Sequence, residues 1–489
     1  MPSFFPLGEK TSLLFIILYA VNILLGFAVV FLERKSPSAT LAWLMVLFVF
    51  PGVGALLYLI LSQNLSRYRI THRSTYEEER FTNALRSQIS DMENGIYRFK
   101  DSDFSRWEQL IRMNQEYGFS YFTQDNSVEF ITDGEELFDR MISDIDSAWN
   151  SIDMEYFIVK PDETGKRVID ALTRAAKRGI EVRLLLDALG SLYMQGGALR
   201  ELEAAGGKVS WFLPARVFRI HWEVNYRNHR KICVIDSRIG YTGGFNIADE
   251  YTGRSKKFGG WRDTHVRLEG GCIEDLDQRF VMDWRFASKE PFSVNPYEYH
   301  SAVEKGDVGI QILSSGPDDP DRNQIEMAYL KMISSARKSI IIQSPYFIPG
   351  DSIKNALKNA ALSGVDVSIM IPNRPDHIFV YWVTYSNVGD LLSSGVKVYV
   401  YDKGFLHSKM MSVDGEVSSV GSANFDIRSF KLNFESSAII YGSSAARELE
   451  RAFERDIEDS FRLTERIYRN RSAWTKFKEC ISRLVSDIL

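Results

Sequence analysis

Two long apolar runs open the chain. Residues 11–31 and 39–61 contain no charged side chain, and a short polar segment with Arg34 and Lys35 separates them. As helices with a rise of 1.5 Å per residue they would be about 32 and 35 Å long, whereas the hydrocarbon core of a bilayer is about 30 Å thick. We therefore predict a two-helix transmembrane hairpin within residues 1–64.

A cleaved secretory signal is the alternative for the first run. That run exceeds an ordinary signal core, lacks a convincing small-residue cleavage site and is followed at once by a second apolar run, so we favour the hairpin. Basic residues flank the outer ends of the hairpin more than its turn: Lys10, Arg67, Arg69, Arg73 and Arg80. By the positive-inside rule, we expect the polar remainder of this multi-pass protein to face the cytoplasm.

Strand-like and helical patterns alternate from about residue 128 onward. In the first half, a strand-like run over 151–159 precedes an amphipathic helix that ends at Gly179. In the second half, a similar run over 338–348 precedes a helix that ends at Gly364. A buried strand follows the helix in each half. Matched order in two halves predicts two α/β domains that arose by internal duplication.

The boundaries of these domains follow from changes in periodicity. We expect a connector over 65–127, a first domain over 128–290 and a second over 305–463, with an aperiodic linker around 286–306. Residues 464–489 predict a C-terminal amphipathic helix, whose apolar face collects Trp474, Phe477, Ile481, Leu484, Val485 and Ile488. We favour packing of this helix on the second domain over a position in the membrane interface.

Composition narrows the class of protein. The chain has 489 residues, a net charge of -5 and a pI of about 5.9, which argues against nucleic acid as a partner. Its three cysteines are widely spaced, so neither a zinc site nor a disulfide framework is predicted. Cys233 lies within an apolar run and is expected to be a buried thiol.

One motif, H-x-K-x4-D-x6-G-x-x-N, occurs twice, 178 residues apart. Its two copies are His229, Lys231, Asp236, Gly243 and Asn246, and His407, Lys409, Asp414, Gly421 and Asn424. His and Lys two positions apart on a strand point to the same face. The recurrence of the cluster predicts one site assembled from two halves.

The residue types in this motif suit phosphoryl transfer without a metal. One imidazole can attack phosphorus, and the other can protonate the departing alkoxide and then deprotonate the incoming hydroxyl. Both lysines and the small residues Gly243, Gly244 and Ser422 would stabilise the charged phosphorus, together with Asn246 and Asn424. Because each Lys would repel a cation beside its His, we predict no metal and no other cofactor.

Further carboxylates are candidates to orient the histidines. Asp263 and Glu435 each follow the histidine of their own half by about thirty residues, and we expect them to orient the imidazoles. Asp236 and Asp414, counted with the catalytic motif, are expected to brace the site. The histidines outside the motif are taken as structural: His72, His221, His300 and His377. His265 is interpreted as a core residue, with a supporting role beside Asp263 as the alternative.

The paired motifs resemble the HKD signature of the phospholipase D superfamily. Within it, the chain resembles the bacterial cardiolipin synthases over nearly its full length. The resemblance is carried by SPSATLAWLMVLFVFPGVGALLYL, NHRKICVID, GYTGGFNIADEY, WRDTHVRLEG, QSPYFIP, LHSKMMSVDG, GSANFDIRSF and LNFE. Ser422 replaces the glycine of the first copy, a variation that the family tolerates.

This resemblance implies a fold, a reaction and a location. The fold would be two phospholipase D-like α/β/α domains related by a pseudo-twofold axis. The reaction would condense two phosphatidylglycerol molecules in the bacterial cell membrane into cardiolipin and glycerol. By similarity His229 would be the nucleophile and His407 the general acid and base, although the likeness of the halves leaves the reverse open. A homo-oligomer is also left open.

Four other functions share parts of this pattern. A hydrolytic phospholipase D would use water in place of the second lipid, and a related transferase would use phosphatidylethanolamine or another alcohol. A nuclease of the same superfamily is disfavoured by the acidic pI and the apolar N-terminus. A non-catalytic scaffold is disfavoured because both copies of the motif are intact.

Overall fold

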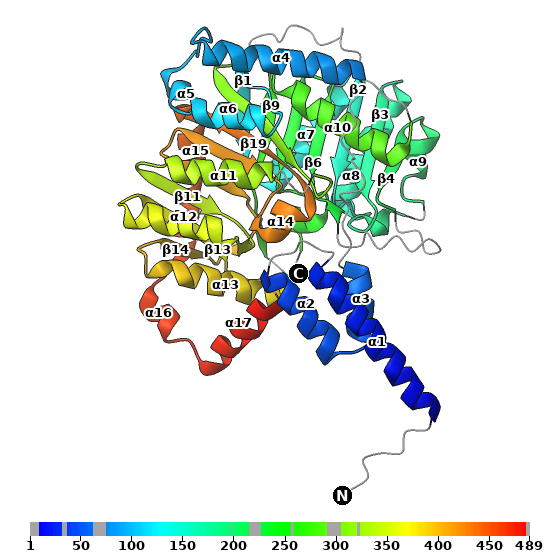
Figure 1. Cartoon of the computed structure of the whole chain (residues 1–489). Coiled ribbons are helices and arrows are strands. Elements are labelled where there is room, and N and C mark those ends of the chain that lie inside the picture. The colour runs from blue at the N-terminus through cyan, green and yellow to red at the C-terminus, as the bar shows by residue number, and fades with distance from the viewer. Residues whose placement is uncertain are drawn as a thin grey trace, which may run out of the picture.

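A computed structural model describes most of the chain (Figure 1). The described residues are 9–31, 37–61, 75–195, 197–214, 226–255, 259–290, 305–319 and 323–485. Several residues weighed above lie outside them: Arg34, Lys35, Arg67, Arg69, Arg73, His72, His221, His300 and Ile488. Most of the expected linker, 291–304, also lies outside the described residues.

The apolar N-terminus forms three helices rather than two. They are α1 (Glu9–Phe31), α2 (Pro37–Val49) and α3 (Val53–Leu61), so a turn interrupts the second expected helix. Pro51 has no amide hydrogen to continue a helix, and Gly52 adopts a φ of +88° that other residues rarely tolerate. The chain folds back at this turn, which brings the rings of Trp43 on α2 and Tyr58 on α3 to within 5.4 Å of each other.

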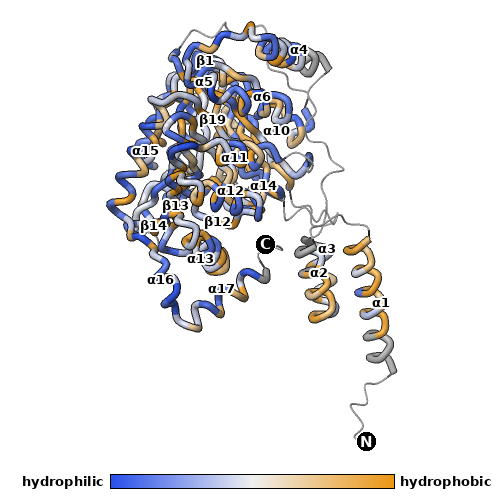
Figure 2. The backbone as a smooth tube through the Cα atoms, turned by 60° about the vertical axis from the view of Figure 1, so that its left-hand side comes forward, coloured by the Kyte–Doolittle hydropathy of each residue, from blue (hydrophilic) through white to orange (hydrophobic). Residues whose placement is uncertain are grey.

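The three helices are apolar along most of their length, as Figure 2 shows for α1 and α2. Of the helices in the described part of the chain, none combines the length and apolarity of a membrane-crossing segment. Large apolar side chains nevertheless remain exposed on α1 to α3, among them Leu24, Phe27, Phe31, Leu41 and Val53. The helices pack on one another through a small core that includes Val29, Trp43 and Leu47.

Within the described residues, the first half of the chain contributes seven strands to the continuous path of a mixed sheet. They are β1 (Thr123–Ile131), β2 (Ser151–Tyr156), β3 (Glu181–Asp187), β4 (Lys208–Phe212), β6 (Lys231–Ile235), β7 (Ile239–Gly243) and β9 (His265–Glu269). Their order is β4-β3-β2-β6-β7-β9-β1. The first three strands pair in parallel, and the remaining neighbours pair antiparallel.

The second half repeats this arrangement strand for strand. Its strands are β10 (Val308–Ser315), β11 (Ser339–Gln343), β13 (Asp366–Pro372), β14 (Lys397–Tyr401), β16 (Met410–Val413), β17 (Val417–Gly421) and β19 (Asn433–Tyr441). Their order, β14-β13-β11-β16-β17-β19-β10, matches the first half, and β20 (Ser460–Leu463) adds an outer edge. The predicted duplication is therefore confirmed.

The two halves share one continuous sheet. Strands β1 and β10 pair antiparallel at its centre, with Thr123 opposite Ile310 and Asn126 opposite Val308. Strand β1 begins at residue 123, a few residues before the expected start of the first domain. The expected pair of domains is thus two halves of one body, related by a pseudo-twofold axis that passes between these strands.

Helices cover both faces of the sheet in each half. The first half carries α7 (Gly134–Ser147), α8 (Glu163–Lys177), α9 (Arg200–Ala204) and α10 (Ile273–Ser288), and the second carries α11 (Gln324–Ser335), α12 (Asp351–Leu362), α13 (Ile378–Leu392), α14 (Ile427–Lys431) and α15 (Ser443–Glu458). Alternate residues of β6 divide between the two faces. Cys233 and Ile235 pack with α7 and α8, whereas Ile232 and Val234 share a core with α10.

The expected connector and C-terminal helix both pack on this body. The connector contains α4 (Thr75–Glu93), α5 (Ser102–Arg106) and α6 (Glu108–Glu116), and α6 packs against α11 and β10. After α16 (Glu465–Arg469), the final helix α17 (Ala473–Val485) packs against α13 in the second half, as predicted (Figure 1). Trp474, Phe477 and Ile481 on α17 remain exposed.

A buried amide of β10 fixes the connector to the centre of the sheet. Gln311 is fully buried and donates to the carbonyl oxygens of Ile111 (3.2 Å) and Ser120 (3.1 Å). Its carbonyl oxygen accepts from Asn114 (3.0 Å) and from the Tyr441 hydroxyl (2.7 Å). This one side chain therefore satisfies four polar groups that are removed from water.

We predict that Gln311→Leu destabilises the protein by about 2–4 kcal/mol, because it leaves several buried donors and acceptors unpaired. The measurement is the shift of the urea midpoint of the full chain in detergent. Gln278→Leu, at a half-buried position of α10 outside this hydrogen-bond network, serves as the matched control and should change stability by no more than about 0.5 kcal/mol. Equal midpoints for the two variants would contradict the assignment.

Candidate active site

A short strand precedes each motif histidine and pairs with a strand of the opposite half, so that both histidines lie where the two halves meet. β5 (Arg227–Asn228) pairs in parallel with the start of β19, and the His229 amide donates to the Phe434 carbonyl oxygen at 2.9 Å. In the same way, β15 (Gly404–Leu406) pairs with β8 (Gly260–Arg262), and the His407 amide donates to the Arg262 carbonyl oxygen at 2.7 Å. Each histidine is thus fixed to the backbone of the opposite half.

This backbone pairing places each histidine beside a carboxylate of the other half. Nδ1 of His229 lies 3.0 Å from both carboxylate oxygens of Glu435, and Nδ1 of His407 lies 2.6 Å from Oδ2 of Asp263. The two carboxylates nominated from the sequence do contact the imidazoles. Each, however, serves the histidine of the opposite half and not the one that it follows along the chain.

The protonation state of the histidines follows from these contacts. Burial lowers the pKa of His229 to about 4, although Glu435 acts in the opposite sense, and burial together with Lys409 lowers the pKa of His407 to about 4. Burial alone would raise the pKa of each carboxyl, but the adjacent His and Lys residues hold the pKa of Glu435 and of Asp263 below the usual value. Nδ1–H therefore donates to an ionised carboxylate, and Nε2 keeps its lone pair.

The motif lysines lie behind the histidines. Both are buried, and the ammonium of Lys231 donates to the His229 carbonyl oxygen at 2.6 Å. Lys409 makes the equivalent bond to the His407 carbonyl oxygen. Burial lowers the pKa of Lys231 to about 7 and that of Lys409 to about 8. These ammonium groups therefore gain or lose their charge near neutral pH.

Neighbouring side chains of the protein, and not a ligand, occupy the space beside the glycines of the first motif copy. A Cβ at Gly244 would meet the carboxylate of Asp263, and a Cβ at Gly243 would meet His265. The amides of Gly244 and Ser422 donate to carbonyl oxygens of the neighbouring strands at 2.9 and 2.8 Å. Their expected role as amide donors to phosphate is therefore wrong for the arrangement seen here.

Ser422, which replaces the glycine of the first motif copy, contacts a carboxylate through its hydroxyl. The Ser422 hydroxyl donates to Oε2 of Glu435, and the Asn433 amide donates to Oε1 at 3.1 Å. The carboxylate beside His229 therefore has two further donors. The departure of Ser422 from glycine is thus explained by the contact that it makes with Glu435.

Both motif asparagines border the cavity described below, but they differ in their hydrogen bonds. Asn246 donates to the Tyr251 hydroxyl (2.8 Å) and accepts from the Ile158 amide (3.2 Å), so its side chain is already engaged. Oδ1 of Asn424 is buried and has no hydrogen-bond partner among the described residues. Of the two, Asn424 is the better placed to meet a ligand.

The motif aspartates lie at the opposite end of their strands from the histidines. Asp236 accepts from the amides of residues 149–151, at 2.7 Å from Asn150, and Asp414 accepts from those of residues 337–339, at 2.6 Å from Lys338. Arg106 of the connector also pairs with Asp414. Both aspartates therefore brace the sheet, and the part of the expectation that counted them with the catalytic groups is not supported by their position.

The remaining single residues are placed as follows. His265 is fully buried without a hydrogen-bond partner among the described residues, and burial lowers its pKa to about 3, which fits a neutral core residue. Cys233 is a buried thiol of β6, as expected. His377, taken as structural from the sequence, is instead exposed and borders the cavity described next.

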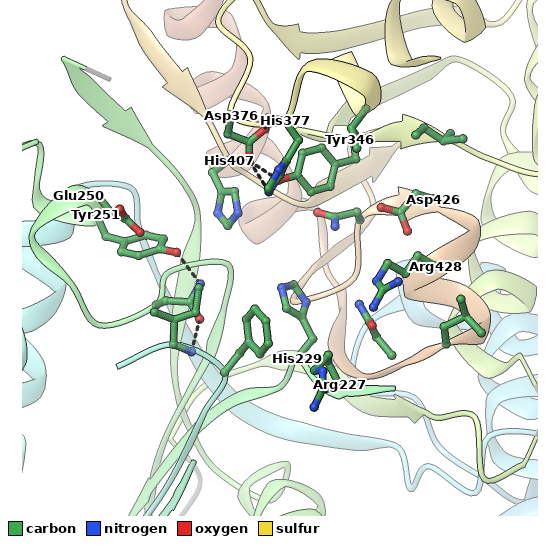
Figure 3. Close-up of a pocket in the computed structure, with 18 of the residues that line it drawn as sticks. Arg227, His229, Glu250, Tyr251, Tyr346, Asp376, His377, His407, Asp426 and Arg428 are labelled. Atoms are coloured by element: carbon green, nitrogen blue, oxygen red, sulfur yellow. Dashed lines mark hydrogen bonds and ion pairs between the residues drawn. The ribbon is translucent and has the colours of Figure 1, made fainter. Parts of the chain in front are cut away.

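A cavity of about 610 Å³ opens between the two histidines (Figure 3). Figure 3 shows the imidazoles of His229 and His407 facing one another across it. Aromatic rings flank them: Phe157 lies 5.0 Å from His229, and Trp261 lies 5.1 Å from His407. Apolar side chains such as Val380 and Val383 of α13 continue the lining.

Sequence reasoning missed several residues that line this cavity. They are Phe157, Arg227, Glu250, Tyr251, Trp261, Tyr346, Asp376, Asp426, Arg428 and Asn433. Seven of these ten lie within five residues of a motif position or of an orienting carboxylate, as Arg227 and Arg428 do. Proximity to the motif in sequence was the available signal, but it does not tell which of the neighbours face inward.

Comparisons with known proteins agree with this geometry. The family described as "Cardiolipin synthase, PLD-like domain" matches residues 141–257 and 329–457, and "Phospholipase_D-nuclease N-terminal" matches residues 20–63. The chain is 45% identical to the major cardiolipin synthase of Bacillus subtilis strain 168, over 98% of this chain and 99% of that protein. It is 43% identical to a cardiolipin synthase of Staphylococcus aureus strain Mu50, over 97% and 96%.

A solved structure supports the fold. The phosphatidylserine synthase of Haemophilus influenzae Rd KW20 superposes with a TM-score of 0.60 at 17% sequence identity, over 78% of this chain and all of that one. At this identity the likeness concerns the fold alone. Together with full-length relatives above 40% identity, it identifies the chain as a member of the bacterial cardiolipin synthase family of the phospholipase D superfamily.

Proposed function

We propose that this enzyme condenses two phosphatidylglycerol molecules into cardiolipin and glycerol through a covalent phosphatidyl-histidine. The observation that carries the proposal is the pair of imidazoles that face one cavity, each held at Nδ1 by a carboxylate of the opposite half (Figure 3). That arrangement directs two Nε2 atoms at one phosphorus. The relatives named as cardiolipin synthases support cardiolipin as the product.

In the first half-reaction, Nε2 of His229 attacks the phosphorus of one phosphatidylglycerol. The bond between phosphorus and the glycerol oxygen breaks. His407, which takes up a proton at Nε2 when the anionic phosphodiester binds beside it, donates that proton to the oxygen as glycerol leaves. The imidazolium that attack creates at His229 is stabilised by the ionised Glu435 at Nδ1. The product is a phosphatidyl group on His229 and a neutral His407.

In the second half-reaction, His407 takes the proton from the terminal hydroxyl of a second phosphatidylglycerol. The new oxygen–phosphorus bond forms while the nitrogen–phosphorus bond to His229 breaks, which yields cardiolipin. Over the two steps together, one phosphodiester is exchanged for another of similar energy, so no nucleotide is consumed. The buried ammonium groups of Lys231 and Lys409 stabilise the charge that gathers on the phosphoryl oxygens.

We further propose that the chain works at the bacterial cell membrane, with its catalytic body on the cytoplasmic side. Its substrates are lipids, and apolar side chains of α1 to α3 such as Leu24, Phe27 and Phe31 are exposed to the surroundings. Burial of such side chains in hydrocarbon would offset the cost of leaving them in water. Anchoring would also hold the cavity close to the lipid headgroups.

The direct test is incubation of the purified full chain with labelled phosphatidylglycerol as the only lipid. We expect cardiolipin and free glycerol in equal amounts. Phosphatidic acid as the sole lipid product would instead indicate a hydrolytic phospholipase D. Addition of phosphatidylethanolamine tests the related transferase, because a mixed product would show that this lipid competes as donor or acceptor.

The roles of the two histidines can be separated with a lipid donor whose leaving group is nitrophenol, which departs without a proton. We expect His407→Ala to keep a rapid burst of nitrophenol, equal to the enzyme present, and His229→Ala to lose it. Cardiolipin formation from phosphatidylglycerol should fall by about 10³-fold or more in both variants. A burst in the His229 variant alone would reverse the two roles.

Glu435 and Asp263, which each hold the histidine of the opposite half, should matter to catalysis as much as the histidines do. We expect Glu435→Gln and Asp263→Asn each to lower kcat by about 10²–10⁴-fold, because an amide neither fixes the same tautomer nor stabilises the imidazolium. Glu129→Gln, which removes an exposed carboxylate that pairs with Arg140, is the matched control and should leave kcat within about twofold. Equal kcat for all three variants would refute the orienting role.

The lowered lysine pKa values predict a loss of activity at alkaline pH. Since Lys231 and Lys409 carry their charge below pKa values of about 7 and about 8, kcat/KM should decline as pH rises through this window. Lys409→Arg should move the decline to higher pH, because a guanidinium keeps its charge. Identical pH profiles for wild type and variant, with otherwise measurable activity, would disprove this origin of the decline.

A further inference from the structure

The cavity between the histidines is symmetric in backbone and asymmetric in charge. Residues at equal offsets from the motif can be compared directly, since the two copies have the same internal spacing. Four residues after the motif asparagine, the first half has Glu250 and the second has Arg428. Two residues before the motif histidine, the first half has Arg227 and the second has Phe405.

A third position shows the same contrast. Two residues before the orienting carboxylate, the first half has Trp261 and the second has Asn433. Trp261 packs on His407 at 5.1 Å and on Phe405 at 4.9 Å, so the surroundings of His407 are aromatic. Asn433 instead donates to Glu435, the carboxylate that holds His229.

These differences collect on one side of the cavity. Arg227, Arg428 and Asn433 all line it, and Figure 3 shows the two arginines beside His229, away from Glu250 and Tyr251. We call these three residues the basic end of the cavity. Asp426 lies beside Arg428 there, and burial raises the pKa of this carboxyl to about 6. The reaction at the phosphorus requires only the symmetric elements, namely the two histidines, their carboxylates and the lysines. The basic end therefore needs a separate explanation.

The orientation of Asn433 adds an acceptor to the basic end. Because Glu435 is ionised and can only accept, the NH₂ group of Asn433 must face it, and Oδ1 must point elsewhere. That Oδ1 is buried and has no hydrogen-bond partner among the described residues. A buried acceptor of this kind is costly unless a ligand supplies a donor, such as a hydroxyl group.

The two lipids of the proposed reaction differ in the position of their phosphate relative to the reacting centre. The donor brings its single phosphate to the histidines. The acceptor brings a hydroxyl to the same centre, and a glycerol of three carbons connects that hydroxyl to a second phosphate. This second phosphate carries a negative charge that must be accommodated in the cavity or beside it. Arginine side chains suit such a group, because their N–H donors match phosphate oxygens.

We infer that the basic end is a second headgroup subsite, in which Arg428 and Arg227 bind the phosphate of the acceptor phosphatidylglycerol and Asn433 Oδ1 accepts from its glycerol. The inference rests on the proposed function and adds the residues that select the acceptor. Free glycerol or water lacks a phosphate and gains nothing from this subsite. An anionic lipid acceptor would therefore be favoured over both.

The test compares two acceptors in one enzyme. Exchange of labelled free glycerol into phosphatidylglycerol reports the donor half-reaction, whereas cardiolipin formation also requires the acceptor lipid. We expect Arg428→Gln to lower cardiolipin formation by about tenfold or more while glycerol exchange falls by less than about threefold. Arg428→Lys, which keeps a positive charge, should recover part of the cardiolipin activity.

A control variant accounts for the loss of a charge as such. Arg140→Gln removes an exposed arginine that pairs with Glu129, and it should leave both activities unchanged. Equal losses of exchange and cardiolipin formation in Arg428→Gln would overturn the subsite, because Arg428 would then serve the donor or the fold. No loss in either activity would overturn it as well. Wild-type protein that exchanges no glycerol would instead refute the transfer reaction, and with it the subsite that depends on it.

Discussion

The hydrogen bonds between each histidine and a carboxylate of the opposite half are the contacts on which the rest of the site depends. Glu435 fixes His229, and Asp263 fixes His407, across more than a hundred residues of chain. Two parallel pairs of short strands, β5 with β19 and β8 with β15, bring these partners together. Because neither half contains a complete histidine–carboxylate pair, a half that folded by itself would hold an unoriented imidazole and an unpaired buried carboxylate. A second half is therefore required to complete each histidine–carboxylate pair.

Burial of so many ionisable groups at one seam requires that each be paired. The two carboxylates keep their charge because imidazoles and ammonium groups surround them, and the lysines lie close to losing theirs because burial disfavours an unsolvated cation. A bound phosphodiester would supply a nearby anion that favours the charged form of these lysines. The site is thus arranged for a negatively charged group, and its aromatic walls strengthen the charge interactions inside it.

Symmetry holds for the backbone and for the reacting groups, and it is broken in the polar and charged residues that line the cavity. Asp263 occupies the space that a side chain at Gly244 would need, whereas the longer Glu435 receives a hydrogen bond from Ser422 in the equivalent position. The exchange of Glu250 for Arg428 at equal offsets changes the sign of charge at the two ends of the cavity. A duplicated fold can in this way keep one reaction centre and still distinguish a donor from an acceptor.

The sequence by itself determined the duplication, the order of strands and helices, and the identity of the histidines, lysines and orienting carboxylates. Identical motif spacing and matched hydrophobic periodicity carry that information, because both depend on neighbours along the chain. Only the tertiary structure decided that Glu435 serves His229 and Asp263 serves His407, that Asp236 and Asp414 cap strands away from the cavity, and that the two halves share one sheet. It also revealed the turn at Pro51 and Gly52 that divides the second apolar run. These contacts depend on how strands from the two halves pair across the pseudo-twofold axis. A local pattern of residues does not determine which half a side chain will contact.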